Sequence, residues 1–172
     1  MRKALLIILL LLSFDFMAQD ARIEAGLMYN FAINTEWPVN KTTGDFVIVI
    51  VGKAKVESFL KTLAKTKKIN NRPIVIKKVN AISEIKNCHI LFFSKSMKAI
   101  LPEAITYAKK NKVMLITEGF GRTKKGAGIS FTITSGTSDF TLKTSYDINP
   151  DALAKYGLKA NNKLLNLGTI SK

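Results

Sequence analysis

The sequence has almost none of the residues on which most catalytic and metal sites depend. Cys88 is the only cysteine and His89 the only histidine among its 172 residues. One thiol cannot form an internal disulfide, and one Cys with one His cannot supply the ligands of a zinc site. Adjacent residues of a strand point to opposite faces, so the two cannot act as nucleophile and base. The sequence therefore predicts no catalytic residues, no metal and no cofactor, and Cys88, which precedes an apolar run, is expected to be buried.

Arginine is also scarce, although the chain is strongly basic. The net charge is +15 at pH 7, yet only Arg22, Arg72 and Arg122 follow residue 18. Proteins that read base edges favour the planar guanidinium of arginine, so the composition argues against a nucleic-acid partner. The scattered lysines form either a solvated shell that keeps the protein soluble or a surface that attracts anionic lipid headgroups or an acidic partner.

The one long apolar run lies at the N-terminus. Arg2 and Lys3 precede the apolar stretch 4–12, and Ala18 offers a small residue for cleavage. This is the pattern of a secretory signal peptide, and the run is shorter than the roughly 20 residues that span a bilayer. We expect a signal peptide over residues 1–18, with a retained N-terminal anchor as the alternative. A single exported domain over residues 19–172 would then work in the periplasm, without access to chromosomal nucleic acid.

Helical and strand patterns alternate through most of the chain. Helical spacing of Ile23, Leu27, Met28 and Phe31 is followed by apolar runs of strand length. The expected strands are Phe46–Val51, Ile74–Val79, His89–Phe93 and Val113–Thr117. Between them lie helical patterns, including a short helix expected over residues 81–86, and such alternation is typical of a mainly parallel sheet.

The pattern changes after residue 128. Two segments of alternating polarity, around Phe131 and Leu142, predict a β-hairpin. Asn149 and Pro150 then provide a cap and a first residue for a helix. The predicted fold class is α/β, with a three-layer arrangement: a mainly parallel sheet, helices on both faces, and a C-terminal antiparallel hairpin at one edge.

The carboxyl ends of the expected strands carry few chemical groups, although ligands of such sheets bind there. The loop that begins at Gly52 lacks the full Gly-x-Gly-x-x-Gly pattern of dinucleotide sites. Glu118 is a single carboxylate and a weak basis for acid–base chemistry. One rival hypothesis is a hydrolase that uses Ser94 or Ser130 with His89, which requires these side chains within hydrogen-bond reach.

Trp37, the only tryptophan, has two interpretations. Its ring either packs against the sheet or anchors a partner surface, where Trp is enriched. A second rival hypothesis, a module that binds a small molecule or cell-wall fragment, would use Trp37 and the strand-end serines to line a pocket.

Several segments together resemble the YfiR-like family of periplasmic repressors. The likeness covers nearly all of the chain after residue 18. It is carried by Tyr29-Asn30-Phe31 through Glu36-Trp37-Pro38, Phe46 to Gly52, Asn71-Arg72-Pro73-Ile74, Cys88 to Ser94, Gly126 to Phe131, Asp147-Ile148-Asn149, and Gly157-Leu158-Lys159 to Lys163-Leu164-Leu165.

The resemblance implies an envelope regulator that acts by binding and is not an enzyme. Such a protein would repress an inner-membrane diguanylate cyclase, or a sensor kinase, by binding its periplasmic part. An outer-membrane-associated protein would release it, and a homodimer is expected. Redox control through an internal disulfide is not available to a chain with one cysteine. We place the expected partner contacts on Glu36, Trp37, Pro38, Arg72 and Lys163.

Overall fold

The computed structural model describes residues 20–135, 142–166 and 168–171. The expected signal peptide of residues 1–18 and the turn of the expected hairpin lie outside the described residues. The first described element is a helix over residues 20–33. No helix in the described ranges is both long and apolar enough to cross a membrane.

The centre of the molecule is an eight-stranded sheet with the order β10-β8-β7-β6-β5-β2-β4-β3. Its five inner strands from β4 to β7 are parallel. The outer strands are short or belong to hairpins. The strands are β2 (Phe46–Val51), β3 (Lys68–Ile69), β4 (Arg72–Val79), β5 (Ile90–Phe93), β6 (Met114–Glu118), β7 (Ile129–Ser135), β8 (Leu142–Ile148) and β10 (Thr169–Ile170).

Each of the four apolar runs forms a strand, and β7 and β8 pair antiparallel as predicted. The hairpin is not the last element on its side, because β10 pairs parallel to β8 beyond it. The second predicted strand begins earlier than expected, at Arg72. Asn70 and Asn71 have φ values of 49° and 63°, which suit the tight turn that joins β3 to β4.

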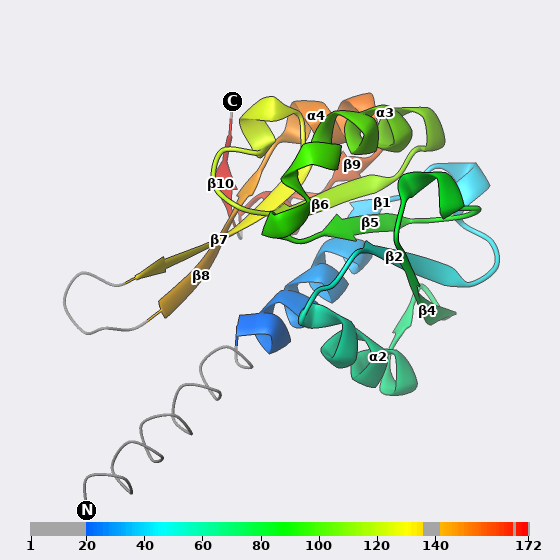
Figure 1. Cartoon of the computed structure of the whole chain (residues 1–172). Coiled ribbons are helices and arrows are strands. Elements are labelled where there is room, and N and C mark those ends of the chain that lie inside the picture. Colours follow the sequence, from blue (N-terminus) through cyan, green and yellow to red (C-terminus); the bar gives the residue numbers. More distant parts are fainter. Residues whose placement is uncertain (1–19, 136–141, 167, 172) are drawn as a thin grey trace, which may run out of the picture.

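Helices cover both faces of the sheet (Figure 1). The N-terminal helix and α2 (Val56–Thr66) lie on one face, and α3 (Leu101–Asn111) and α4 (Pro150–Lys155) lie on the other. The helix expected near residues 81–86 is a single 3-10 turn, Ile82–Glu84. The side chain of Asn149 accepts a hydrogen bond of 2.8 Å from the Ala152 amide, which confirms the predicted cap.

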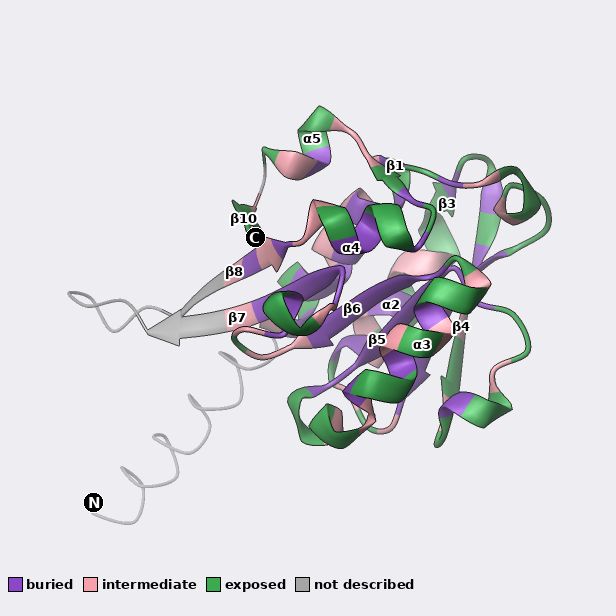
Figure 2. Ribbon diagram, turned by 90° about the horizontal axis from the view of Figure 1, so that it is seen from above, coloured by how far each residue is buried: buried purple, intermediate pink, exposed green. Residues whose placement is uncertain are grey.

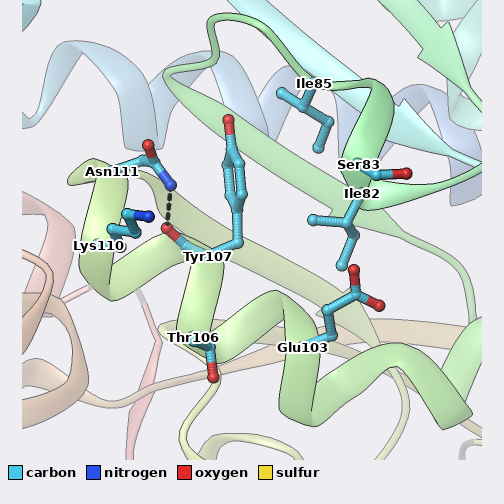
Figure 3. Close-up of a pocket in the computed structure, with 8 residues that line it drawn as sticks. All are labelled: Ile82, Ser83, Ile85, Glu103, Thr106, Tyr107, Lys110 and Asn111. Atoms are coloured by element: carbon cyan, nitrogen blue, oxygen red, sulfur yellow. Dashed lines mark hydrogen bonds between the residues drawn. The ribbon is translucent and has the colours of Figure 1, made fainter.

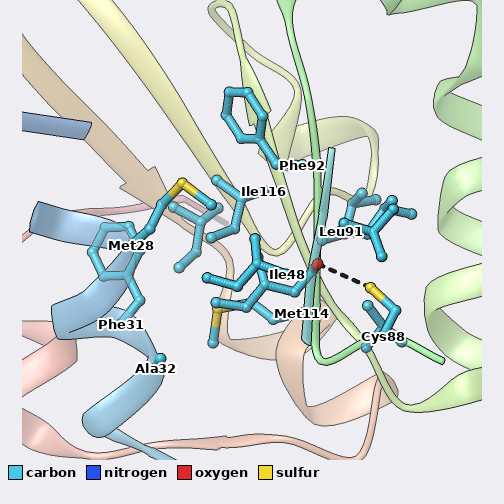
Figure 4. Packing of buried hydrophobic residues seen from close by; sticks show 14 of the residues in the cluster. Met28, Phe31, Ala32, Ile48, Cys88, Leu91, Phe92, Met114 and Ile116 are labelled. Carbon is cyan, nitrogen blue, oxygen red and sulfur yellow. Dashed lines mark hydrogen bonds between the residues drawn. The ribbon is translucent and has the colours of Figure 1, made fainter. Parts of the chain in front are cut away.

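The core lies between the sheet and these helices, and β2 and β5 are buried along their whole length (Figure 2). Met28 and Phe31 of the N-terminal helix point toward Ile48 and Ile116 of the sheet (Figure 4). Cys88 is fully buried, as predicted, and its thiol lies 2.9 Å from the Ile90 carbonyl oxygen. Burial raises the pKa of this thiol to about 12, so it stays protonated.

A second, two-stranded sheet joins the two ends of the domain. β1 (Thr35–Glu36) follows the N-terminal helix and pairs antiparallel with β9 (Lys159–Ala160). The short helix α5 (Asn162–Leu165) follows β9, and its cap residue Asn161 donates from its backbone amide to the Asn34 carbonyl at 3.1 Å. Residues far apart in sequence therefore meet near the amino ends of the parallel strands.

Candidate functional site

Trp37 and Phe46 form the centre of a buried cluster at the amino ends of β2, β4 and β5. Their rings meet edge to face, with centroids 5.1 Å apart and planes at 81°. The Trp37 indole N–H donates to the Ala32 carbonyl oxygen at 2.9 Å, and the side chain is only 9% exposed. The structure thus favours the packing interpretation of Trp37, whose ring is covered within the chain.

Arg72 and His89 hold the neighbouring loop in place by sharing one acceptor. The Arg72 guanidinium donates to the Lys41 carbonyl oxygen at 2.8 Å and lies 5.2 Å from the Phe46 ring centroid. The Nε2 atom of His89 lies 3.1 Å from the same carbonyl oxygen, while Nδ1 accepts from the Val47 amide at 3.0 Å. Since a carbonyl only accepts, Nε2 carries the proton of the neutral ring.

This environment keeps His89 neutral. Burial and, to a smaller extent, the nearby charges of Arg72 and Lys41 together lower its pKa to about 4. Both ring nitrogens already have partners. His89 is therefore occupied as a structural group and is not available as a general base.

The geometry also separates the residues of the hydrolase hypothesis. Ser94 follows β5 at its carboxyl end, while His89 precedes β5, which places them about 16 Å apart along the strand at roughly 3.3 Å per residue. Ser130 donates to the Gly119 carbonyl oxygen at 2.6 Å. Neither serine lies within reach of the imidazole, so the hydrolase hypothesis is wrong in the form that used these residues.

Two other expected contact residues, Glu36 and Pro38, flank Trp37 in the sequence, and a third, Lys163, lies on α5. Glu36 is exposed and forms an ion pair of 3.1 Å with Lys159 across the small sheet. Pro38 is half-buried, and Lys163 is exposed on α5. The structure therefore brings Glu36, Trp37, Pro38 and Arg72 to one edge, with Lys163 on the helix that follows β9.

Val39 was missed at the sequence level, and it is the most exposed large apolar side chain described, at 87%. It begins a 3-10 turn, Val39–Lys41, whose last carbonyl is held by Arg72 and His89. A lone valine between Pro38 and Asn40 was the available signal. We use the name amino-edge surface for the exposed or half-exposed residues Glu36, Pro38, Val39 and Lys163.

The opposite edge of the sheet carries a cavity of about 310 Å³. It lies between the N-terminal helix and the loops that follow β2, β5 and β6. A hollow of about 230 Å³ adjoins it and shares three of its residues, Glu24, Lys95 and Glu118. We call this the carboxyl-edge cavity. The larger part is lined by Asp20, Ala21, Glu24, Lys53, Ala54, Lys55, Ser94, Lys95, Ser96 and Glu118.

Glu24, which lines this cavity, is unusual because it is a buried acidic residue. Its side chain is only 4% exposed, and its carboxyl makes no hydrogen bond or ion pair with any described residue. Burial and, to a smaller extent, repulsion from Glu118 and Asp20 together raise its pKa to about 8. Its spacing to Met28 and Phe31 was the signal, because it places Glu24 on the buried face of the helix. Ile23, expected on that face, is instead 42% exposed.

A model of the YfiR/HmsC-like family matches residues 21–169, which is nearly the whole described chain. The chain belongs to the YfiR/HmsC-like family. Membership confirms the resemblance and indicates a periplasmic regulator in cyclic-di-GMP signalling. No curated protein matches the sequence.

Two solved structures resemble this YfiR/HmsC-like chain in fold. A conserved domain protein from Vibrio cholerae matches with a TM-score of 0.59 and 12% identity, over 88% of this chain and 60% of that one. The ABC domain in complex with L-Trp from Streptococcus pneumonia matches with a TM-score of 0.50 and 8% identity, over 74% of this chain and 55% of that one. The chain thus spans less than two thirds of either structure, and the likeness confirms the α/β fold.

A third hollow of this YfiR/HmsC-like protein lies between the 3-10 turn at Ile82 and α3 (Figure 3). Its volume is about 480 Å³, and burial raises the pKa of its Tyr107 hydroxyl to about 12. The Asn111 amide donates to the Tyr107 carbonyl oxygen at 2.9 Å, so it is used within the helix. Across residues 20–135, 142–166 and 168–171, no three metal-binding side chains lie together.

Proposed function

We propose that this protein represses an inner-membrane signalling enzyme, a diguanylate cyclase or a sensor kinase, by binding its periplasmic part. Family membership supports a regulator of this signalling system. A binding repressor acts by preferring the inactive state of its target, and it needs a firm surface rather than a catalytic group. A protein that acts by binding alone would lower the activity of the target only while it is bound.

The amino-edge surface is the proposed contact. The observation that carries it is the position of Val39, which is exposed while its turn is held by Arg72 and His89. A preorganised apolar side chain loses little conformational freedom on binding, and it gains from burial. Trp37 and Arg72, which are buried, would then not contact the target directly. They would support binding by holding the turn that carries Val39 in place.

Charge supports the same surface. Glu36 and Lys159 are both largely exposed, with side chains 65% and 76% exposed. Lys163 adds a positive charge on α5. Such polar rims around a small apolar centre are typical of protein interfaces. We propose further that the exported protein is a homodimer, and that an outer-membrane-associated protein releases the target by competing for it.

The substitution Val39→Glu tests the contact. We expect it to weaken binding of the target at least tenfold, because a carboxylate would replace the apolar side chain at the centre of the interface. Cells that carry this variant should show raised cyclic-di-GMP or raised kinase output, as should cells that lack the protein. Cross-linking in the cell envelope, followed by capture of the tagged protein, would identify the target.

Ile170→Glu is the matched control, since Ile170 is also an exposed apolar residue, at 44%, but lies on the outermost strand β10. It should leave signalling output and capture unchanged. If deletion of the protein changes neither cyclic-di-GMP nor kinase output, the proposed function is wrong. If Val39→Glu and Ile170→Glu behave alike, the proposed surface is wrong.

A further inference from the structure

The carboxyl-edge cavity lies at the point where the strand order reverses. From β2 the chain moves to β4 on one side of β2 and then to β5 on its other side. The connections of β2 and β5 therefore leave the sheet in opposite directions, and they open a crevice beyond the carboxyl ends of these strands. In open parallel sheets this crevice is where ligands bind.

The loops around the cavity are held by hydrogen bonds that do not involve Glu24. The Lys95 amide donates to the Glu118 carboxylate at 3.0 Å, and the Arg122 guanidinium donates to the Lys95 carbonyl oxygen at 3.0 Å. The hydroxyl oxygens of Ser94 and Ser96 lie 2.8 Å apart. The cavity therefore has a built wall, and the buried Glu24 carboxyl in that wall has no hydrogen-bond partner among the described residues.

Glu24 and Glu118 favour a cationic group in the cavity. A buried carboxylate without a partner is costly, and a second acid nearby increases the cost of its charge. A protonated amine placed between Glu24 and Glu118 would pair with both, and Glu24 would lose its proton on binding. Metal ions are a poorer fit, because no group of three ligating side chains is found among the described residues.

A bare cation does not fit the rest of the cavity. Lys53 and Lys95 are exposed and line it, and they would repel a ligand with only positive charge. Together with the hydroxyls of Ser94 and Ser96 they offer contacts for an anionic group. The cavity volume of about 310 Å³ suits a small ligand.

We propose that the carboxyl-edge cavity binds a small zwitterion, a molecule that carries a protonated amine and an anionic group a few bonds apart. The amine pairs with Glu24 and Glu118, and the anionic group contacts Lys53, Lys95 and the serine hydroxyls. This site lies at the edge opposite the amino-edge surface, so a ligand would bind there whether or not that surface engages a partner.

Isothermal titration calorimetry of the purified protein tests the site with phosphoethanolamine and β-alanine as probes. Ethanolamine and ethyl phosphate each lack one of the two charges. We expect at least one zwitterion to bind with a Kd of about 1 mM or lower, and both single-charge analogues to bind about tenfold more weakly or less. Vesicles of phosphatidylethanolamine form a separate arm, because the same chemistry occurs in lipid headgroups.

Two variants assign the roles of the residues. Glu24→Gln should weaken zwitterion binding about tenfold or more and should abolish proton release, which is measured near pH 6.5 from the heats in two buffers of different ionisation enthalpy. Lys53→Ala, at an exposed position, should weaken the zwitterion but leave ethanolamine unchanged. Glu103→Gln, on α3 and outside this cavity, is the control and should bind as the unmodified protein does.

Three outcomes would overturn the proposal. The first is no heat from either zwitterion at about 10 mM. The second is equal affinity for a zwitterion and for a single-charge analogue. The third is sedimentation with vesicles while soluble phosphoethanolamine gives no heat, which would indicate a surface for lipid and not a cavity site. Since Lys53→Ala does not alter a buried residue, it keeps the test valid even if Glu24→Gln fails to fold.

Discussion

The two edges of the parallel sheet treat buried polar groups in opposite ways. At the amino edge, Trp37, Arg72 and His89 all donate to backbone carbonyls nearby. At the carboxyl edge, Glu24 is as deeply buried but faces a cavity and two other acids. Arg72 Nε has no partner among the described residues, but the other contacts of the first edge hold it together, so it can present a firm surface. The second edge retains a carboxyl group that a ligand could satisfy.

The pKa values express the same difference. Burial and nearby positive charge lower the pKa of His89 to about 4, whereas burial and nearby acids raise the pKa of Glu24 to about 8. Both groups are mainly neutral at pH 7, yet they respond to pH in opposite directions. His89 should weaken the fold in acid, and Glu24 should weaken it in base. Substitutions at the two edges can therefore separate their roles.

The largest effect is expected from Trp37→Ala at the amino edge. Loss of a buried aromatic ring typically lowers the free energy of unfolding by about 3–5 kcal/mol. The variant should also lose target binding, because the turn that carries Val39 would no longer be held. Urea denaturation measures the first effect. A loss below about 1 kcal/mol would mean that the ring contributes little to the closed edge.

The second largest effect is expected from Glu24→Gln at the carboxyl edge. The pKa of Glu24 is about 8 in the folded protein against 4.5 in the unfolded chain, so the folded state binds more protons between these values. Stability contributed at this position falls as pH rises from 4.5 through 8, by up to about 1.4 kcal/mol for each unit of the pKa difference.

The variant should therefore be more stable than the unmodified protein at pH 9 and nearly equal to it at pH 5, as measured by urea denaturation at both values. Glu103→Gln, at an exposed position, serves as its control. Equal differences at both pH values would show that Glu24 does not carry the raised pKa.

A smaller effect in the opposite direction is expected from His89. Its pKa is about 4 in the folded protein against 6.5 in the unfolded chain, so the unfolded state binds more protons between these values. The stability it contributes is present above pH 6.5 and is lost as pH falls through 4. His89→Asn should be less stable at pH 7 but should lose less on acidification, and NMR titration of the single imidazole would measure the pKa directly.

The smallest effect on stability is expected from Glu36→Ala. The ion pair with Lys159 is exposed on both sides, and such pairs contribute about 0–1 kcal/mol. Thermal unfolding should hardly change, whereas capture of the target should weaken if the amino-edge surface is the contact. A large loss of stability without any loss of capture would assign Glu36 to the fold alone.

The sheet could be predicted because its strands are buried on both faces. Continuous apolar runs such as Phe46–Val51 mark such strands without reference to any partner. The outer strand β10 could not be predicted, because two residues carry no period, and their pairing with Asp147 and Ile148 depends on where the chain returns. The pairing of β1 with β9 could not be predicted either, because both strands are only two residues long.

The candidate sites were less accessible to sequence reasoning. Glu36, Pro38 and Lys163 were selected from the family resemblance, and the structure places them on the surface. Whether Trp37 is buried was left open, because a tryptophan after a helix suits either role. The residues next to Trp37 in the sequence do not show which ring packs against it in the folded protein.

The order of the main strands and helices, the α/β class and the burial of Cys88 followed from the amino-acid sequence alone, because apolar periodicity is a local property. Only the tertiary structure decided that Glu24 faces a cavity with Glu118 and that Arg72 and His89 share one carbonyl. These contacts join residues on separate elements, and their energies depend on burial and distance, which exist only once the chain has folded.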